Sequence, residues 1–144
     1  MWGINKKGFT LIELLIVIAI IAILSAVGFS LVIITNLQKA RDGKRKADVE
    51  SLRSALEIYR SENGHYPNVT GDVAGLSITL NANYISAIPN DPTPGSYYYF
   101  EGLNCNGAGC LSYNLCAAME RSGYVDSCAP GSCGATCNYK TTNP

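Results

Sequence analysis

The sequence predicts an α+β fold, in which a long N-terminal α-helix, apolar in its first half, packs on a small antiparallel β-sheet head with a cysteine-rich C-terminal region. Three observations predict this fold. Residues 14–38 form a run of 25 residues without a charge. Residues 36–62 contain no proline and carry apolar side chains at helical spacing. Beyond residue 63 the composition changes to Gly, Asn, Pro, Ser and Tyr, which is typical of turns and short strands.

The uncharged run predicts a membrane segment. As a helix it spans about 37 Å at ~1.5 Å per residue, which is enough to cross a hydrocarbon layer of about 30 Å. All six cysteines lie beyond residue 104, on the far side of this segment. An even number of cysteines in a short extracytoplasmic region favours disulfides. We therefore expect a membrane-anchored chain with its C-terminal part in an oxidising compartment.

The start of the chain differs from an ordinary secretory signal. Lys6 and Lys7 supply a basic beginning, but the apolar run is longer than the roughly 7–15 residues of a signal peptide. Residues 24–26, Leu-Ser-Ala, offer only a poor cleavage site. Glu13 also stands in the apolar stretch, and a carboxylate at the centre of a membrane costs roughly 2.5–3.5 kcal/mol. Glu13 therefore calls for a functional explanation.

The N-terminus resembles that of type IV prepilins and type II secretion pseudopilins in the sequence KKGFTLIE at residues 6–13, followed by the apolar run LLIVIAII. The resemblance implies that a membrane-embedded prepilin peptidase cuts between Gly8 and Phe9 and methylates the new Phe9 amine. Residues 1–8 would then be a cytoplasmic leader that is removed, and residues 9–38 a transmembrane helix that becomes the filament core. The alternative is a plain N-terminal anchor that keeps its leader.

Physical chemistry gives Glu13 a role in assembly. Cleavage would create a positive amine at Phe9, because an α-amino group titrates near pH 8. In an apolar bundle an unpaired charge is costly, whereas a paired one is tolerated. Glu13 of an incoming subunit can therefore use the Phe9 amine of its neighbour as a register mark, a pairing that the resemblance also implies. The alternative is a pair within one helix, since residues four apart share a helix face.

The helix is expected to continue as an amphipathic segment over residues 39–63. Gly64 and then Pro67 supply signals for its end. Its predicted apolar stripe consists of Val49, Leu52, Ala55, Leu56 and Tyr59. A basic cluster begins the segment and consists of Lys39, Arg41, Lys44, Arg45 and Lys46, opposed only by Asp42. We expect this cluster to contact lipid headgroups before assembly or acidic neighbours in a filament; a solvated helix face is the alternative.

Residues 64–144 predict a globular β-sheet head with a disulfide-rich tail. Residues 96–100 read as one strand. Residues 111–120 alternate in polarity and read as a half-buried strand, whose apolar face should lie on the helical stripe. That face consists of Leu111, Tyr113, Leu115, Ala117 and Met119. Two strands make a marginal sheet, so a further strand is expected from residues 76–80 or from the tail.

A second resemblance concerns the head. The sequence NGHYP at residues 63–67, followed by residues 84–100, is similar to the major pseudopilin of type II secretion, and the matching segments span most of residues 1–100. That family has a calcium site in an acidic loop, and the last 40 residues here contain cysteines instead of such a loop. This difference favours a structural subunit of a type IV pilus-like extracellular filament. The alternatives are a periplasmic pseudopilus subunit of type II secretion and a membrane-anchored binding protein that does not polymerise.

Six cysteines predict three disulfides, and six allow fifteen connectivities. The cysteines are Cys105, Cys110, Cys116, Cys128, Cys133 and Cys137. Cys116 lies on the strand face opposite Tyr113, so Cys128, Cys133 or Cys137 in a tail folded over that face is its expected partner. Cys105 and Cys110 flank the turn at residues 106–109, and they can close on each other or hold the tail.

The sequence favours a structural protein over an enzyme. His65 is the one histidine and lies in a turn, without clustered acids for a proton relay. The cysteine spacing lacks the CxxC pairs of structural zinc, and we expect no cofactor or metal. The expected partners are further copies of the chain, the prepilin peptidase, an inner-membrane assembly platform, minor pilins and membrane lipid. A global charge argument for nucleic acid fails at zero net charge, although Tyr97, Tyr98 and Tyr99 offer a stacking platform for single-stranded DNA.

Overall fold

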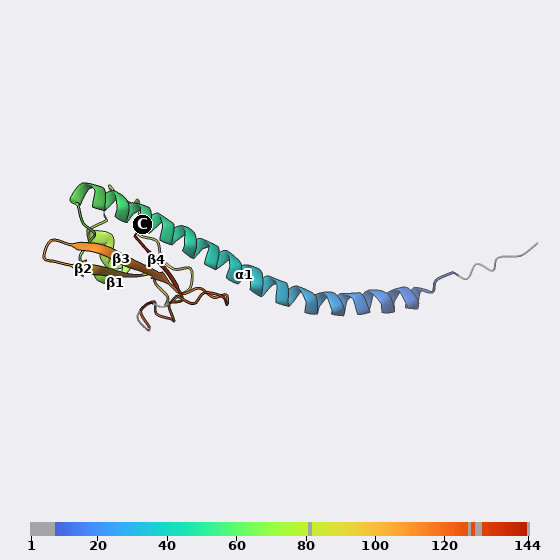
Figure 1. Cartoon of the computed structure of the whole chain (residues 1–144). Helices are drawn as coiled ribbons and strands as arrows, with labels where there is room; N and C mark the ends of the chain where they lie inside the picture. The colour runs from blue at the N-terminus through green and yellow to red at the C-terminus, as the bar shows by residue number, and fades with distance from the viewer. Residues whose placement is uncertain (1–7, 81, 127, 129–130, 144) are drawn as a thin grey trace, which may run out of the picture. The chain divides into compact units, whose positions relative to one another are not determined.

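The computed structural model describes residues 8–80, 82–126, 128 and 131–143, without the side chains of residues 27–32. Most of the predicted leader, residues 1–7, lies outside this description. The chain divides into two compact units, residues 1–37 and residues 38–144. The elements in chain order are α1 (Leu11–Asn63), β1 (Thr70–Asp72), the 3-10 helix η1 (Val73–Ile78), β2 (Tyr99–Cys105), β3 (Cys110–Ala117) and β4 (Tyr139–Thr142) (Figure 1).

Helix α1 begins and ends on local signals. At its start the Thr10 hydroxyl accepts a hydrogen bond from the backbone N–H of Glu13 at 3.3 Å, while the Glu13 carboxylate accepts from the backbone N–H of Thr10 at 2.9 Å. At its end Gly64 takes a φ of 78°, in the left-handed region that glycine tolerates best, and its N–H donates to the Arg60 carbonyl at 2.7 Å. Helix α1 therefore ends at Asn63, just before Gly64.

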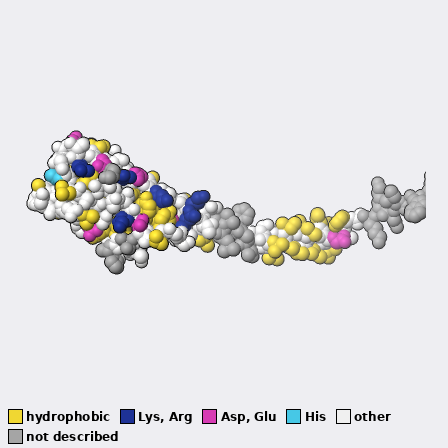
Figure 2. All heavy atoms as spheres, viewed as in Figure 1, with side chains coloured by type: hydrophobic (Ala, Val, Ile, Leu, Met, Phe, Trp, Pro, Cys, Tyr) yellow, Lys and Arg dark blue, Asp and Glu magenta, His cyan; other side chains and the backbone are white. Residues whose placement is uncertain are grey.

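The first unit exposes the apolar side chains that the structure describes at its start. Phe9 is 86% exposed and Leu11 82% exposed. Figure 2 shows hydrophobic side chains spread along the described surface of this segment. Further exposed apolar side chains are Ile12, Leu14, Leu15, Ile16, Val17, Ile18, Ile20, Ile21, Ile23 and Leu24. Among the described residues, no helix meets the length and apolarity needed to cross a membrane. The predicted membrane segment includes residues 27–32, whose side chains lie outside the description.

The head is built on a four-stranded antiparallel sheet in the order β1-β2-β3-β4. Residues 38–63 of α1 belong to the same compact unit, and the predicted stripe lies in its core. Val49, Leu52 and Leu56 are fully buried, and Tyr59 packs against the core. The sheet contributes Phe100, Tyr113, Leu115 and Ala117 to this core. The predicted α+β fold, a long helix on a small antiparallel sheet, is confirmed.

Two predicted strands differ from the structure. The first begins at Tyr99 rather than at residue 96, because Tyr97 donates its N–H to the Cys133 carbonyl and the Tyr98 carbonyl accepts from Val73. β2 then continues to Cys105 and pairs with β3. Residues 76–80 form the end of η1 and the turn after it instead of a strand. The tail, the other candidate, supplies β4.

Both faces of β3 are covered. The face predicted to lie on the helix carries Tyr113, Leu115 and Ala117 in the main core, although Leu111 at its beginning is 63% exposed and was wrongly placed there. The opposite face carries Cys116, which forms a second buried cluster with Ala118, Cys133 and Cys137. The cysteine-rich tail therefore folds over the outer face of the sheet and covers it.

Candidate functional site

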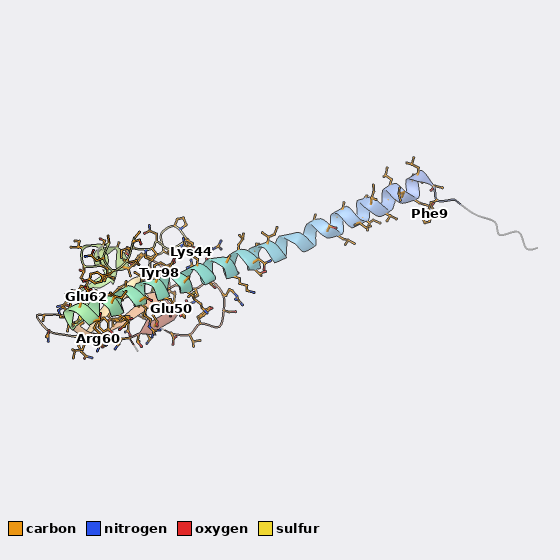
Figure 3. The ribbon with its side chains drawn as sticks, turned by 90° about the horizontal axis from the view of Figure 1, so that it is seen from above. Phe9, Lys44, Glu50, Arg60, Glu62 and Tyr98 are labelled. Carbon is orange, nitrogen blue, oxygen red and sulfur yellow. A yellow bond between two sulfur atoms is a disulfide. The ribbon has the colours of Figure 1, made fainter. Side chains whose placement is uncertain are left out.

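The predicted processing and assembly residues lie at the exposed start of the first unit. Gly8 and Phe9 precede the helix, and Phe9 is 86% exposed (Figure 3). The Glu13 carboxylate is also exposed and accepts hydrogen bonds from the Thr10 backbone N–H and from the Thr10 hydroxyl at 2.8 Å. Thr10 and Glu13 thus form a capping box, in which the two side chains reciprocally satisfy helix N-terminal N–H groups.

This capping box was not predicted from the sequence. Its signal is present, because a threonine followed three residues later by a glutamate before an apolar run is the usual pattern. In the chain that still carries its leader, Glu13 therefore has a local role as a helix cap. Its pairing with a free Phe9 amine requires the amine that cleavage would create, and that pairing stays a prediction.

A buried ion-pair cluster joins α1 to two distant parts of the head. The Arg45 guanidinium donates to Asp91 through Nε at 2.8 Å and Nη2 at 2.9 Å, and to Asp42 and Glu120 at 3.0 Å each. It also donates to the Thr93 hydroxyl at 2.7 Å. The side chains of Arg45, Asp42 and Asp91 are at most 3% exposed. Four oxygen-bearing groups from three segments of the chain thus converge on one buried cation.

Neighbouring groups complete the cluster. Arg41 donates through Nε and Nη2 to both carboxylate oxygens of Glu120. Asp42 accepts from the backbone N–H groups of Glu120 at 2.9 Å and Arg121 at 3.1 Å. The hydrogen bonds from Arg41, and then from Arg45, lower the pKa of Glu120 to about 2 in spite of partial burial. The hydrogen bond to Asp91 is the largest cause that raises the pKa of Arg45.

The basic cluster predicted from the sequence therefore divides into two groups. Arg45 is buried inside the head, whereas Arg41 pairs with Glu120 but keeps 37% of its side chain exposed. The prediction that Arg45 contacts lipid or a filament neighbour is therefore wrong, and so is a solvated face for Arg45. The opposing acids Asp91 and Glu120 lie 46 and 75 residues after Arg45, beyond the reach of local patterns. Lys39, Lys44 and Lys46 remain exposed; Figure 3 labels Lys44 on α1.

Of the three tyrosines proposed as a stacking platform, Tyr98 belongs to the core. Its hydroxyl donates to Asp48 on α1 at 2.6 Å, and desolvation, followed by this hydrogen bond, raises its pKa (Figure 3). Tyr99 packs against the second buried cluster, and Tyr97 is half-buried. A platform of three exposed rings is therefore absent from this part of the described chain. These three tyrosines no longer support the hypothesis of single-stranded DNA binding.

The predicted disulfides are present and close three short loops. Cys105 pairs with Cys110 across the β2–β3 turn, Cys116 pairs with Cys128, and Cys133 pairs with Cys137. The two alternatives for Cys105 and Cys110 are thus decided in favour of mutual closure. Cys116 reaches the tail, and Cys128 is the partner among the three candidates. The described residues contain no group of three or more His, Cys, Asp or Glu side chains arranged to hold a metal ion.

Comparisons with known proteins identify the family. Residues 4–29 match the prokaryotic N-terminal methylation motif, and residues 32–112 match the model of type II secretion system (T2SS), protein G. The chain belongs to the type II secretion system protein G family. No solved structure gives a significant match to this family member.

Relatives that the chain resembles along most of their length are named type II secretion system core protein G. The type II secretion system core protein G of Escherichia coli (strain K12) is 33% identical over 106 residues, which cover 65% of this chain and 70% of that protein. The core protein G of Pectobacterium carotovorum subsp. carotovorum is 32% identical over 108 residues, which cover 66% of this chain and 67% of that protein. That of Aeromonas hydrophila is 32% identical over 109 residues, which cover 65% and 71%.

Membership in the protein G family changes the order of the sequence-based hypotheses. The resemblance to prepilins and pseudopilins is confirmed. A type IV pilus subunit was preferred because cysteines replace an acidic loop. The comparisons relate the chain to such subunits only broadly, and the alternative, a type II secretion pseudopilin, fits them better. The matched region ends at residue 112. Most of the cysteine-rich tail, on which the preference for a pilus subunit rested, lies beyond it.

The tail of this protein G family member is expected to loosen on reduction before the helix does. Residues 121–144 contribute few apolar side chains to the core, and each disulfide typically contributes about 2–4 kcal/mol. Limited proteolysis with peptide mapping, with and without reductant, measures the effect, and the first cuts should fall after residue 120. Serine at both Cys105 and Cys110 is the control and should leave the tail resistant. Six free thiols in natively exported protein, or a tail equally resistant after reduction, would contradict the expectation.

Proposed function

We propose that this chain is a structural subunit of a type II secretion pseudopilus, a periplasmic filament assembled through the N-terminal helix. The observation that carries the proposal is the exposed apolar surface of the first unit, in a chain that belongs to the protein G family. Phe9, Leu11 and Leu24 are each more than two-thirds exposed. Apolar surfaces of this extent mark contacts with other proteins or with lipid.

The burial of apolar surface favours a helix bundle. Full burial of a Leu, Ile or Phe side chain is worth roughly 1.5–3 kcal/mol, so the exposed apolar residues of this one segment supply a large driving force for packing. Every side chain from residue 9 to residue 24 is apolar except those of Thr10 and Glu13, so this part of the helix has no polar face. A helix that is apolar all round is buried in a larger assembly or in a membrane. The same segment thus suits both a membrane-held precursor and a filament core.

Processing would prepare the segment for assembly. We propose cleavage after Gly8 by a prepilin peptidase and methylation of the Phe9 amine, in line with the matched methylation motif. The new cation would meet the Glu13 carboxylate of a neighbouring subunit. This contact would hold the register of a bundle whose apolar side chains alone define register poorly.

The remaining assignments follow from this role. Before assembly the precursor would be held in the inner membrane by residues 9–38, with residues 1–8 in the cytoplasm. Its partners would be further copies of the chain, an inner-membrane assembly platform and minor pilins. We propose a structural role without catalytic activity, cofactor or metal.

Deletion of the gene in its native host tests the proposal. Proteins that normally reach the medium are expected to accumulate in the periplasm, and complementation with the wild-type chain should restore their export. Surface pili should be unchanged in number, because the filament proposed here stays in the periplasm. Loss of surface pili with normal protein export would contradict the secretion role and support the pilus subunit.

A further inference from the structure

A pocket of about 210 Å³ lies on the head between α1 and the segment that follows β3. One wall comes from a single helix face, because Lys39, Gly43 and Lys46 are spaced by three and four residues. The opposite wall consists of Arg121 and Tyr124. Figure 2 shows lysine and arginine side chains gathered on part of the head's surface. All the lining residues belong to the second compact unit.

The charge of this pocket is positive. Lys39, Lys46 and Arg121 line it, and Asp42 is the one acid among its lining residues. The Asp42 carboxylate already accepts from Arg45 and from two backbone N–H groups, so its charge is offset within the neighbouring cluster. Among the described residues, no carboxylate forms a salt bridge with any of the three lining cations. The three cations therefore outnumber the one acid that lines this space, and Asp42 attracts Lys46 without forming a salt bridge with it.

An aromatic pair fixes one of these cations. The Lys46 ammonium lies 5.0 Å from the centre of the Tyr124 ring and 5.7 Å from that of Tyr139, within the range of cation–π attraction. The two rings meet edge to face at 5.8 Å. A hydrogen bond with the Tyr124 side chain is the largest cause that raises the pKa of Lys46. Lys46 is thus held at the pocket wall instead of moving freely in solvent.

We propose that Lys39, Lys46 and Arg121 form a phosphate-binding pocket. Lysine and arginine donate charge-assisted hydrogen bonds to phosphate oxygens, and a pocket of this size accepts a phosphate group with its first substituent. The phosphate belongs to an anionic phospholipid headgroup or is free in solution. Lys39 is the first charged residue after the uncharged run of residues 14–38, and basic clusters beside membrane segments attract anionic lipids. The lipid source rests on the proposed membrane-held precursor, whereas the phosphate site does not.

Nuclear magnetic resonance of the full chain in maltoside micelles, which contain no phosphate, tests the proposal. One arm titrates inorganic phosphate against chloride at constant ionic strength, and the other adds short-chain phosphatidylglycerol. The amide signals of Gly43 and Tyr124 are expected to shift and saturate. Lys46→Gln or Arg121→Gln should raise the apparent Kd roughly tenfold, because each variant loses one charge-assisted contact with the phosphate. Lys44→Gln, an equal change of charge on an exposed lysine outside the pocket, should change it less than about twofold.

Gly43→Glu provides a variant that removes no contact. A Cβ at residue 43 meets no atom within 4 Å, and the new carboxylate would compete with phosphate for the pocket. Saturation in both arms supports a lipid headgroup as the source, and saturation by phosphate alone supports the site with a free anion. Shifts that rise linearly without saturation, or equal weakening in Lys44→Gln and Lys46→Gln, would overturn the proposal.

Discussion

Replacement of Glu13 by glutamine is expected to reduce filament assembly at least about tenfold without loss of the helix cap. Glutamine at this position of a capping box still accepts from the Thr10 N–H, so the local structure at the start of α1 is retained. The carboxylate charge is lost, however, and the Phe9 amine of a neighbouring subunit would enter an apolar bundle unpaired. An uncompensated buried charge costs several kcal/mol, and each 1.4 kcal/mol is about a factor of ten. Filament yield in a strain without the wild-type chain measures the effect.

Two further variants separate the charge of Glu13 from its capping role. Glu13→Val removes both functions and should assemble poorly, although it still inserts in the membrane. Thr10→Val removes the hydroxyl that bonds Glu13, at a cost of about 1 kcal/mol, but keeps the charge, and it should assemble. Normal assembly of Glu13→Gln together with failure of Thr10→Val would show that the cap, not the charge, matters.

Replacement of Arg45 by methionine is expected to destabilise the head by about 3–5 kcal/mol. The substitution leaves the buried carboxylates of Asp42 and Asp91 without the cation that they share, and a broken buried ion pair has a cost of this size. The helix, the loop at residues 89–95 and the turn after β3 lose their common tie at the same time. Unfolding of the full chain by urea in maltoside micelles, followed by near-ultraviolet tyrosine signals, measures the loss.

The matched control is Arg53→Met on the same helix. Arg53 makes one exposed pair with Glu50 at 3.5 Å, and such pairs contribute about 0–1 kcal/mol. Asp91→Asn in the Arg45→Met background should recover part of the lost stability, because it removes one of the unpaired charges. Equal stability of the Arg45→Met and Arg53→Met variants would show that the buried cluster adds nothing to the fold.

Periodic features of the chain were predictable from sequence. Val49, Leu52 and Leu56 recur at helical spacing, and they lie in the core as expected. Gly64 marked the end of α1 because its left-handed φ is a local property of one residue. The N-terminal motif at residues 6–13 predicted the family because its residues are contiguous.

Features that depend on tertiary contacts were not predictable. Arg45 looked like a surface cation, since its partners Asp91 and Glu120 are far along the chain. Residues 76–80 were read as a possible strand, whereas Leu76 and Leu80 reach the core from a 3-10 helix and the turn after it. The Lys46 pocket needs Tyr124, which the chain brings back from beyond β3. The spacing of neighbouring residues carries no information on contacts between distant parts of the chain.

Intact mass spectrometry of the chain from its native membrane tests whether it is processed as a pseudopilin. We expect residues 1–8 to be absent and the new N-terminal Phe9 to carry one methyl group. We also expect the oxidised chain to be six hydrogens lighter than the reduced chain, because three disulfides are closed. A chain that keeps Met1 to Gly8, with an unmodified Phe9, would contradict processing as a pseudopilin and support a simple membrane anchor.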